Sequence, residues 1–357
     1  VRSDSTVESA DMIGGVPAAA ADPSHSLSTT ARRVVRALRS PTASGRTVAG
    51  RLARMPSAER RVRELANENL HLRELYEAWV PTGHFYSPFP DLDDYGRRVA
   101  GLRDPHRELP GIDLHEDEQL ALLEVLAALL DPASGGGGGD LHEHEDRRGD
   151  RRYWLDNPAY AHGDGTVLHA MLRHVRPRRI VEVGSGYSSA LILDTVEQHL
   201  PATTVTFVEP YPALVEGLLR ADDERRVTIH RVPVQDVDPA VFASLEPGDL
   251  LFIDSTHVVK AGSDVNHLFF EVLPRLAVGV WVHLHDIFFP FEYPEAWVRE
   301  GRAWHEAYLL RAFLYRNEAF AIRWFQDMLW ARHREALARL PWVARNPGAN
   351  IWLQRVA

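Results

Sequence analysis

Residues 179–189 read RIVEVGSGYSS: a short apolar run with one carboxylate, two glycines around a serine, and a group of small hydroxyls. The apolar run has the length and residue types of a buried β-strand. Gly184 and Gly186 follow it directly, and a helix is expected from Tyr187 onward. Backbone without side chains lets a ligand approach the main chain and the helix N-terminus. The stretch therefore predicts a ligand-binding turn between a strand and a helix.

The segments around this stretch alternate between strand-like and helix-like patterns. Strand-like runs read RIVEV, TVTFVEP, VTIHRVP, DLLFIDS and GVWVHLHD, and helix-like runs read LHAMLRHVRP, SALILDTVEQHL, PALVEGLLRAD and HLFFEVLPRL. This alternation predicts βαβ units and an α/β fold, with a largely parallel, doubly wound sheet and helices on both faces. Ligands in such sheets bind at the carboxyl ends of the strands, so the chemistry is expected there.

Glu182 distinguishes two kinds of ligand for the glycine turn. A dinucleotide-binding loop, G-x-G-x-x-G, has a third glycine where this chain has Ser189. The carboxylate of Glu182 would repel a pyrophosphate but attract an ammonium group, directly or through water. S-adenosylmethionine combines a cationic amino-acid end with ribose and adenine, so it fits the turn better than a nicotinamide dinucleotide.

Polar residues follow the next three strands as well. Glu209 is placed to accept hydrogen bonds from two ribose hydroxyls. Gln235 and Asp236 follow the third strand, where a carboxylate can take the adenine amino group, and Asp254 ends the fourth strand. Each alone would also be explained as a helix cap or turn residue, but together they indicate a cofactor site. The candidate cofactor-binding residues are Glu182, Gly184, Ser185, Gly186, Ser188, Ser189, Glu209, Gln235, Asp236 and Asp254.

The segment from about Arg152 to Val356 resembles a class I S-adenosylmethionine-dependent methyltransferase. More narrowly, it is similar to the small-molecule branch with EVGSGYSS as first motif and a His-Asp after the fifth strand. The resemblance implies a Rossmann-like, mostly parallel seven-stranded sheet, whose last antiparallel pair would be AFAIRWF and ANIWLQRV. It also implies that the turn at 182–186 surrounds the methionine part of the cofactor, Glu209 its ribose and Asp236 its adenine.

The reacting end is expected where IDSTHVVKAGSDVNH and HLHDIFFPFEYP converge. Methyl transfer from a sulfonium needs alignment of the acceptor and a base that takes its proton. The candidate bases are His257, Lys260 and His285, with His257 preferred because its ordinary pKa lies near neutrality. Lys260 is the single lysine of the chain. The alternative interpretation is that these residues cap a helix, fill a hydrogen-bond gap or lie in solvent.

A metal site is a further hypothesis from the resemblance. Asp254, His285 and Asp286 occupy the positions where metal-dependent O-methyltransferases hold a divalent ion. The histidine makes Mn²⁺, Fe²⁺ or Zn²⁺ more natural than Mg²⁺. His142 and His144 in LHEHED are also potential ligands, but a polar segment beside a glycine run is usually solvated.

Aromatic segments are candidates for the acceptor pocket. FFPFEY follows the fifth strand, and GHFYSPFP in the N-terminal region is a candidate lid. YWLDNPAY, with Tyr153, Asn157 and Tyr160, precedes the first helix of the fold and is expected near the site. The alternative for such aromatic segments is burial in the core.

Composition excludes other classes. The chain has 357 residues, a formal net charge of -10 and no cysteine. Nucleic acids and anionic membranes are bound mainly through Lys and Arg, so neither is an expected partner. Without cysteine there is neither a disulfide nor a thiolate metal site. No stretch approaches the roughly 20 apolar residues of a membrane span and the start lacks the pattern of a secretory signal, so a cytoplasmic location is expected.

The domain organisation follows from the same patterns. Residues 1–30 are expected to form a disordered tail, 31–150 a helical region and lid with a glycine-rich linker at 135–139, and 151–357 the cofactor-binding domain. The N-terminal helices are candidates for homo-oligomer contacts. The leading hypothesis for function is O-methylation, and less readily N-methylation, of a small molecule of secondary metabolism, such as a natural product or its sugar. The alternatives are hydroxylation or cyclisation on the same fold, and a non-catalytic cofactor-binding protein.

Overall fold

The computed structural model describes residues 80–131 and 151–357. The chain divides into two compact units, Val1–Val80 and Pro81–Ala357, and the second contains the sheet. Several predictions lie outside the described residues: the tail at 1–30, the helices before residue 80, the linker at 135–139, and the ligand pair His142 and His144. From the predicted N-terminal region, α4 (Leu92–Leu102) and α5 (Glu116–Leu130) belong to the same unit as the sheet.

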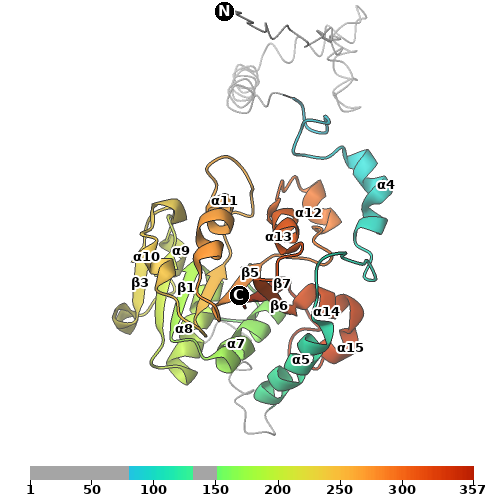
Figure 1. Cartoon of the computed structure of the whole chain (residues 1–357). Coiled ribbons are helices and arrows are strands. Elements are labelled where there is room, and N and C mark those ends of the chain that lie inside the picture. Colours follow the sequence, from blue (N-terminus) through green and yellow to red (C-terminus); the bar gives the residue numbers. More distant parts are fainter. Residues whose placement is uncertain (1–79, 132–150) are drawn as a thin grey trace, which may run out of the picture. The chain divides into compact units, whose positions relative to one another are not determined.

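Seven strands form one sheet in the order β3-β2-β1-β4-β5-β7-β6 (Figure 1). The strands are β1 (Arg179–Val183), β2 (Thr204–Val208), β3 (Val227–His230), β4 (Leu250–Ile253), β5 (Trp281–His285), β6 (Phe320–Phe325) and β7 (Asn350–Arg355). β1 to β5 run parallel, and β7 is antiparallel to both β5 and β6. The predicted doubly wound, mostly parallel seven-stranded sheet is confirmed. Its strand order reverses between β1 and β4, where such folds bind their ligands.

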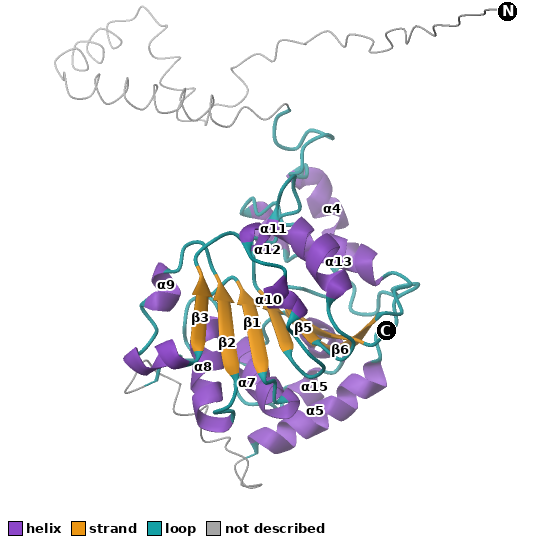
Figure 2. Ribbon diagram, turned by 60° about the vertical axis from the view of Figure 1, so that its left-hand side comes forward, coloured by secondary structure: helices purple, strands orange, loops and turns teal. Residues whose placement is uncertain are grey.

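Helices lie on both sides of the sheet (Figure 2). They are α7 (Gly163–Val175), α8 (Tyr187–His199), α9 (Ala213–Glu216), α10 (Ala240–Ala243), α11 (Asp264–His267), α12 (Glu295–Arg299), α13 (Glu306–Leu314), α14 (Gln326–Arg332) and α15 (Arg334–Leu337). The predicted helix over 212–222 is shorter than expected. Gly217 ends α9, because glycine costs about 1 kcal/mol in a helix interior relative to alanine.

The central strands are buried along nearly their whole length. All of β4 and residues Ile180–Val183 of β1 are buried, as the continuous apolar runs of a parallel sheet require. Glu182 lies within this buried run, so its carboxylate must find hydrogen-bond partners inside the protein.

Polar contacts fix the segments that precede the sheet. Gln119 of α5 is fully buried, and its side-chain oxygen accepts a hydrogen bond from the backbone N–H of Phe325 in β6 at 2.6 Å. Buried Arg152 donates to Asp194 of α8 at 2.7 Å and to Asp223 at 2.6 Å, which ties the segment before α7 to α8. In the described ranges, none of the helices has the length and apolarity needed to cross a membrane.

Candidate functional site

The carboxyl ends of β1, β2 and β4 open into a cavity of about 400 Å³, here named the cofactor cavity. The arrowheads of β1, β2 and β3 end on the same edge of the sheet in Figure 2. Four of the predicted cofactor-binding residues line this cavity: Gly184, Glu209, Gln235 and Asp254. Parallel strands bring these residues together, although up to 70 positions separate them in the sequence.

Gly184 is required by the main chain of the neighbouring strand. Its φ is +84°, and a Cβ at this position would lie 1.8 Å from the carbonyl oxygen of Asp254. No other residue type tolerates both conditions, so the missing side chain lets the turns after β1 and β4 meet. Gly186 is less constrained, because its backbone is extended and a Cβ would lie 3.3 Å from a methyl group of Leu214.

Glu182 lies outside the lining of the cofactor cavity, so the predicted contact of its carboxylate with the ligand stays a prediction. It is completely buried, and its two oxygens accept hydrogen bonds from the hydroxyls of Ser188 at 2.5 Å and Ser189 at 2.6 Å. The Ser189 hydroxyl also accepts from the backbone N–H of Gly186 at 2.9 Å. Burial raises the pKa of Glu182 to about 8, although the two hydroxyls lower it. The carboxyl group therefore holds the glycine turn from behind, and both serine hydroxyls are directed to it.

Glu209 lies in the wall of the cavity after β2. The backbone N–H groups of Ser185 and Tyr211 donate to its two oxygens at 3.1 and 2.8 Å. Each oxygen retains a lone pair that can accept from a ligand hydroxyl. Gln235 donates its side-chain amide to a main-chain carbonyl at 2.8 Å. Asp236 is exposed and lies outside the lining of the cavity, so its contact with adenine stays a prediction.

Four polar side chains meet beside the cofactor cavity and form what is here named the Asp254 cluster: Asp254, His257, His285 and Asp286. Asp254 Oδ1 lies 3.3 Å from both His257 Nε2 and His285 Nδ1. Asp286 Oδ2 lies 3.8 Å from the same nitrogen of His257 and 3.6 Å from that of His285. The two segments that were expected to converge after the fourth and fifth strands therefore do so.

Two members of the Asp254 cluster have unusual backbone conformations. His257 has φ = 60° and Asp286 has φ = 57°. Left-handed backbone at a non-glycine residue costs about 1–2 kcal/mol and persists only where the surroundings enforce it. Such strain is concentrated at functional sites, which supports a functional role for this cluster.

The charges of the Asp254 cluster are strongly coupled. Burial raises the pKa of Asp254, but His285 and His257 outweigh it and hold that pKa well below its usual range. Burial lowers the pKa of His257, yet hydrogen bonds to Asp254 and Glu306 raise it to about 10. Burial raises the pKa of Asp286 to about 6, against the opposing effect of His285. Without a metal ion at the cluster, His257 is therefore charged at neutral pH and is not ready to accept a proton.

Glu306, at the start of α13, orients His257. It is 1% exposed, and its Oε2 accepts a hydrogen bond from His257 Nδ1 at 2.7 Å. The other ring nitrogen, Nε2, therefore points toward Asp254 and Asp286. A ring nitrogen that faces two carboxylates requires a cation between them, which is either its own proton or a metal ion.

The donor atoms of the Asp254 cluster fit a divalent ion. Asp254 Oδ1, His257 Nε2 and Asp286 Oδ2 all lie within 4.8 Å of one another. Neighbouring ligands of an ion with bonds of ~2.1 Å lie roughly 3–4 Å apart. The predicted third ligand was His285, whereas this set contains His257. Both ring nitrogens of His285 are buried without a hydrogen-bond partner in the part of the chain that the structure describes, which leaves His285 as a further ligand.

Asp164 and Tyr160 surround His285 on its other side. Asp164 Oδ2 lies 3.5 Å from His285 Nε2, and the Tyr160 ring lies 4.8 Å from the His285 ring. Burial lowers the pKa of His285, but the three nearby carboxylates raise it well above its usual value. Tyr160 was predicted near the site, but Asp164 was not. Its sequence signal is the flanking pair Gly163 and Gly165, where a Cβ would clash with neighbouring atoms at 2.3 and 2.1 Å.

Lys260 lies apart from the Asp254 cluster. It is exposed and lines the cofactor cavity, and its carbonyl oxygen accepts from the side-chain amide of Asn266 at 2.8 Å. The ion pairs of the cluster join His257 and His285 to carboxylates and do not involve Lys260. Of the three candidate bases, the two histidines lie at the cluster and the lysine on the cofactor side.

A cavity of about 210 Å³, here named the aromatic cavity, adjoins the cluster through Trp304. The ring of Trp304 lies 4.3 Å from that of His257. The lining includes prolines of GHFYSPFP together with Glu292 and Tyr293 of FFPFEY, so both segments predicted for the acceptor pocket contribute. Other aromatic side chains of these segments lie elsewhere, since Phe85 is 81% exposed.

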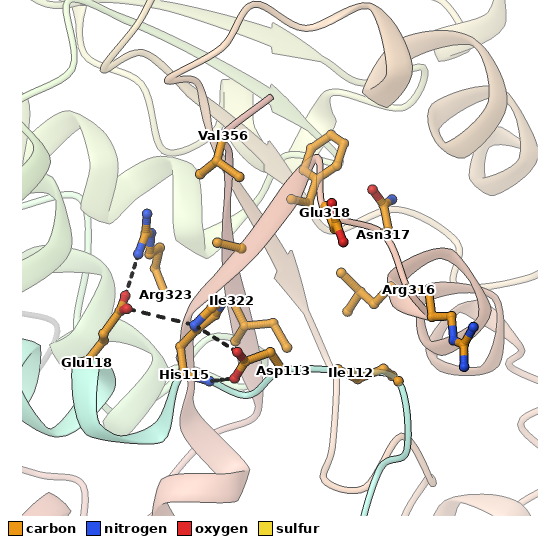
Figure 3. A pocket seen from close by; sticks show the side chains of 14 residues that line it. Ile112, Asp113, His115, Glu118, Arg316, Asn317, Glu318, Ile322, Arg323 and Val356 are labelled. Carbon is orange, nitrogen blue, oxygen red and sulfur yellow. Dashed lines mark hydrogen bonds and ion pairs between the residues drawn. The ribbon is translucent and has the colours of Figure 1, made fainter.

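A larger cavity, of about 1020 Å³, lies along the edge strand β6 (Figure 3). Four of its charged or titratable side chains pair with one another. His115 Nδ1 lies 3.5 Å from Asp113 and 3.8 Å from Glu118, and Arg323 donates to Glu118. Its lining contains no residue from the carboxyl ends of β1, β2 or β4, so its size does not make it the cofactor cavity.

Parts of this chain are similar to known proteins. Residues 181–287 match the family model described as a methyltransferase domain. An uncharacterized protein of Archaeoglobus fulgidus is 34% identical over 172 residues, which cover 46% of this chain and 73% of that protein. The chain is also similar to the O-methyltransferase TomG of Streptomyces achromogenes, solved with SAM, at 17% identity over 57% of this chain and 82% of that one, with a TM-score of 0.37. An O-methyltransferase of Bacillus cereus in complex with SAH matches at 15% identity over 56% and 84% of the two chains, with a TM-score of 0.36.

The domain match covers the strands and turns that form the cofactor cavity and the Asp254 cluster, and the sheet is the predicted mostly parallel one of seven strands, with β6 and β7 as its antiparallel pair. The chain belongs to the class I S-adenosylmethionine-dependent methyltransferases.

Proposed function

We propose that this protein methylates an oxygen of a small molecule with S-adenosylmethionine as donor, and that the Asp254 cluster is the reacting centre. This proposal is supported by the location of Asp254, which lines the cofactor cavity and also belongs to the cluster. A donor in the cavity and an acceptor at the cluster would meet at this residue. In-line displacement depends on such alignment, because the sulfonium supplies a methyl group that is already activated.

The cofactor would be held mainly by main-chain groups and two carboxylates. The turn at 184–186, which carries two glycines, lets the methionine end approach the main chain, and Glu209 accepts from the ribose hydroxyls. Asp236 and Gln235 are assigned to the adenine, as the sequence predicts. Glu182 supports the turn through the serines of α8 and has no direct contact with the cofactor in this proposal.

The cluster is proposed to hold a divalent ion through Asp254, His257 and Asp286, with His285 as a further ligand. Such an ion, when bound, would lower the pKa of an acceptor hydroxyl. The imidazole ligands favour Mn²⁺, Fe²⁺ or Zn²⁺ over Mg²⁺. Glu306 keeps the hydrogen of His257 on Nδ1, so that Nε2 is the atom that binds. The second candidate chemistry uses His257 as the base without an ion. Because its pKa is raised to about 10, only the small deprotonated fraction of His257 would act as a base, and this fraction grows with pH.

Calorimetric titration with S-adenosylmethionine and with NAD tests the cofactor assignment, and release of S-adenosylhomocysteine in the presence of hydroxylated acceptors tests the transfer. We expect S-adenosylmethionine to bind and NAD not to bind. Chelation of divalent ions should abolish transfer while binding of S-adenosylmethionine remains. Transfer that survives chelation would favour His257 as the base. Failure to bind S-adenosylmethionine would reject the proposal, and binding without transfer to any acceptor would favour other chemistry on the same fold.

A further inference from the structure

The aromatic cavity contains one carboxylate that forms no ion pair with any residue that the structure describes. It is lined by Tyr95, Tyr293, Trp304 and Tyr308, together with Glu292. Glu292 accepts a hydrogen bond from the hydroxyl of Tyr308 at 3.1 Å. Burial raises the pKa of Glu292, and this effect outweighs the lowering by the Tyr308 hydroxyl and by nearby Arg107, Arg311 and Arg103. The surrounding arginines therefore do not offset the energetic cost of partly removing the charged carboxylate from water.

The other charges of the cavity are accounted for. Arg302 also lines it, but Glu300 accepts from its Nε at 3.0 Å. Its guanidinium carbon lies 4.2 Å from the ring centroid of Trp297 and 5.1 Å from that of Trp304, so these ring faces already stabilise a cation. Burial lowers the pKa of His305, so this lining residue is neutral near neutral pH. Glu292 is thus the lining charge that a ligand can neutralise.

The cavity is also joined to the reacting centre. Trp304 lines the cavity, and its ring also lies against the His257 ring, with the ring centroids 4.3 Å apart. The backbone N–H groups of the next two residues, His305 and Glu306, donate to the carbonyl oxygen of His257 at 2.9 and 3.2 Å. A molecule that occupies the cavity would therefore lie one aromatic ring away from His257.

We propose that the aromatic cavity binds a protonated amine of the acceptor, with Glu292 as its counter-ion and the rings of Tyr95, Tyr293 and Tyr308 as its walls. Aromatic faces and a carboxylate together recognise ammonium groups, since both present negative potential to the cation. The role of this amine as part of the methyl acceptor rests on the proposed function. The acceptor class is then a small molecule with a cationic amine at one end and the hydroxyl to be methylated at the other.

The test compares benzylamine with its neutral analogue benzyl alcohol, by ligand-observed NMR titration of the full chain at about pH 8, where the amine is charged. We expect benzylamine to bind and benzyl alcohol to bind at least about tenfold more weakly. Glu292→Gln retains an acceptor for the Tyr308 hydroxyl but removes the charge, and it should weaken benzylamine binding by about tenfold without changing that of benzyl alcohol. The matched control is Glu295→Gln, because Glu295 pairs with Arg299 on α12 and does not line the cavity.

Equal binding of the two probes by the unmodified chain would overturn the proposal, and so would unchanged benzylamine binding in the Glu292→Gln variant. The first comparison needs no variant, so it stands even if the substitution disturbs folding. Titration of the same samples with S-adenosylmethionine separates this outcome from failure of the proposed function. The two ligands occupy different cavities, so loss of one binding event leaves the other measurable.

Discussion

Replacing Glu182 by glutamine should make the protein more stable at neutral and alkaline pH. The buried carboxyl group has a pKa of about 8, against an ordinary value of 4.5. In the unfolded chain the group ionises near pH 4.5, whereas in the folded chain it retains its proton until about pH 8. The unfolded state thus binds fewer protons in this interval, so stability falls as pH rises through it. Glutamine has the same shape, cannot ionise, and can accept from one serine of α8 while it donates to the other.

The magnitude follows from the size of the shift. Each pKa unit is worth about 1.4 kcal/mol, so the loss of stability grows to about 3 kcal/mol at pH 7 and is limited to about 5 kcal/mol above pH 8. At pH 5 it is only about 1 kcal/mol. Relative to the unmodified chain, Glu182→Gln should therefore gain roughly 2–3 kcal/mol in free energy of unfolding between pH 5 and pH 7. By pH 9 the relative gain should reach about 4 kcal/mol.

Urea denaturation at about pH 5, 7 and 9 measures this difference directly. The matched control is Glu335→Gln, since Glu335 is exposed on α15 and its loss should not change the slope with pH. Stability curves of the unmodified chain and of Glu182→Gln that run parallel across the three pH values would refute the reasoning. They would mean that Glu182 is ionised in the folded chain and that its two serine hydroxyls fully compensate the buried charge.

Substitutions at three other places test the site. Gly184→Ala should destabilise the fold by at least about 3 kcal/mol, because the new Cβ meets a carbonyl oxygen in a backbone conformation unfavourable to alanine; Gly186→Ala should be tolerated, and thermal denaturation of both checks the contrast. Glu209→Ala should weaken S-adenosylmethionine by about tenfold or more in calorimetry, since two charge-assisted acceptors are lost, and unchanged affinity would exclude a ribose contact. Glu306→Ala should weaken Mn²⁺ binding by about 10–100-fold through loss of orientation of His257, whereas Glu306→Gln retains the acceptor and should lose less. Equal losses would show that Glu306 acts through its charge alone.

The strands and the glycine turn were predictable because their signals are local. Continuous apolar runs such as LLFI in β4 occur where both faces of a parallel strand are covered, and EVGSG marks the turn that follows β1. The direction of the Glu182 side chain was not predictable, because it depends on residues outside the strand. When both faces of a strand are buried, a carboxylate in it has no exposed face to occupy. The contacts of Glu182 therefore depend on Ser188 and Ser189, which lie in the first turn of α8. The sequence identified the residue and the loop but not the direction of the side chain.

Contacts across the fold were harder to foresee. Glu306 lies 49 residues after His257 and begins a helix of its own, so no spacing rule connects the two. Asp164 lies in the first turn of α7 and meets His285 only because α7 packs against the sheet. The family resemblance placed His285, the last residue of β5, in the metal set, whereas the hydrogen bond to Glu306 directs Nε2 of His257 toward the other ligands of that set. Residues that contact the site histidines from a distant element are brought there by tertiary packing, which a local sequence pattern does not reveal.

Asp254 fixes the position of the glycine turn relative to the Asp254 cluster. Its backbone N–H donates to the carbonyl oxygen of Val183 at 2.9 Å, and its own carbonyl oxygen occupies the space that a side chain at Gly184 would need. The turn proposed to hold the methyl donor and the residue proposed to orient the acceptor are therefore joined by main-chain contacts. Main-chain contacts between paired strands vary less than side-chain rotamers do. An in-line displacement requires the donor and acceptor atoms to be held near contact distance and aligned, and a rigid link through Asp254 provides this whichever acceptor is bound.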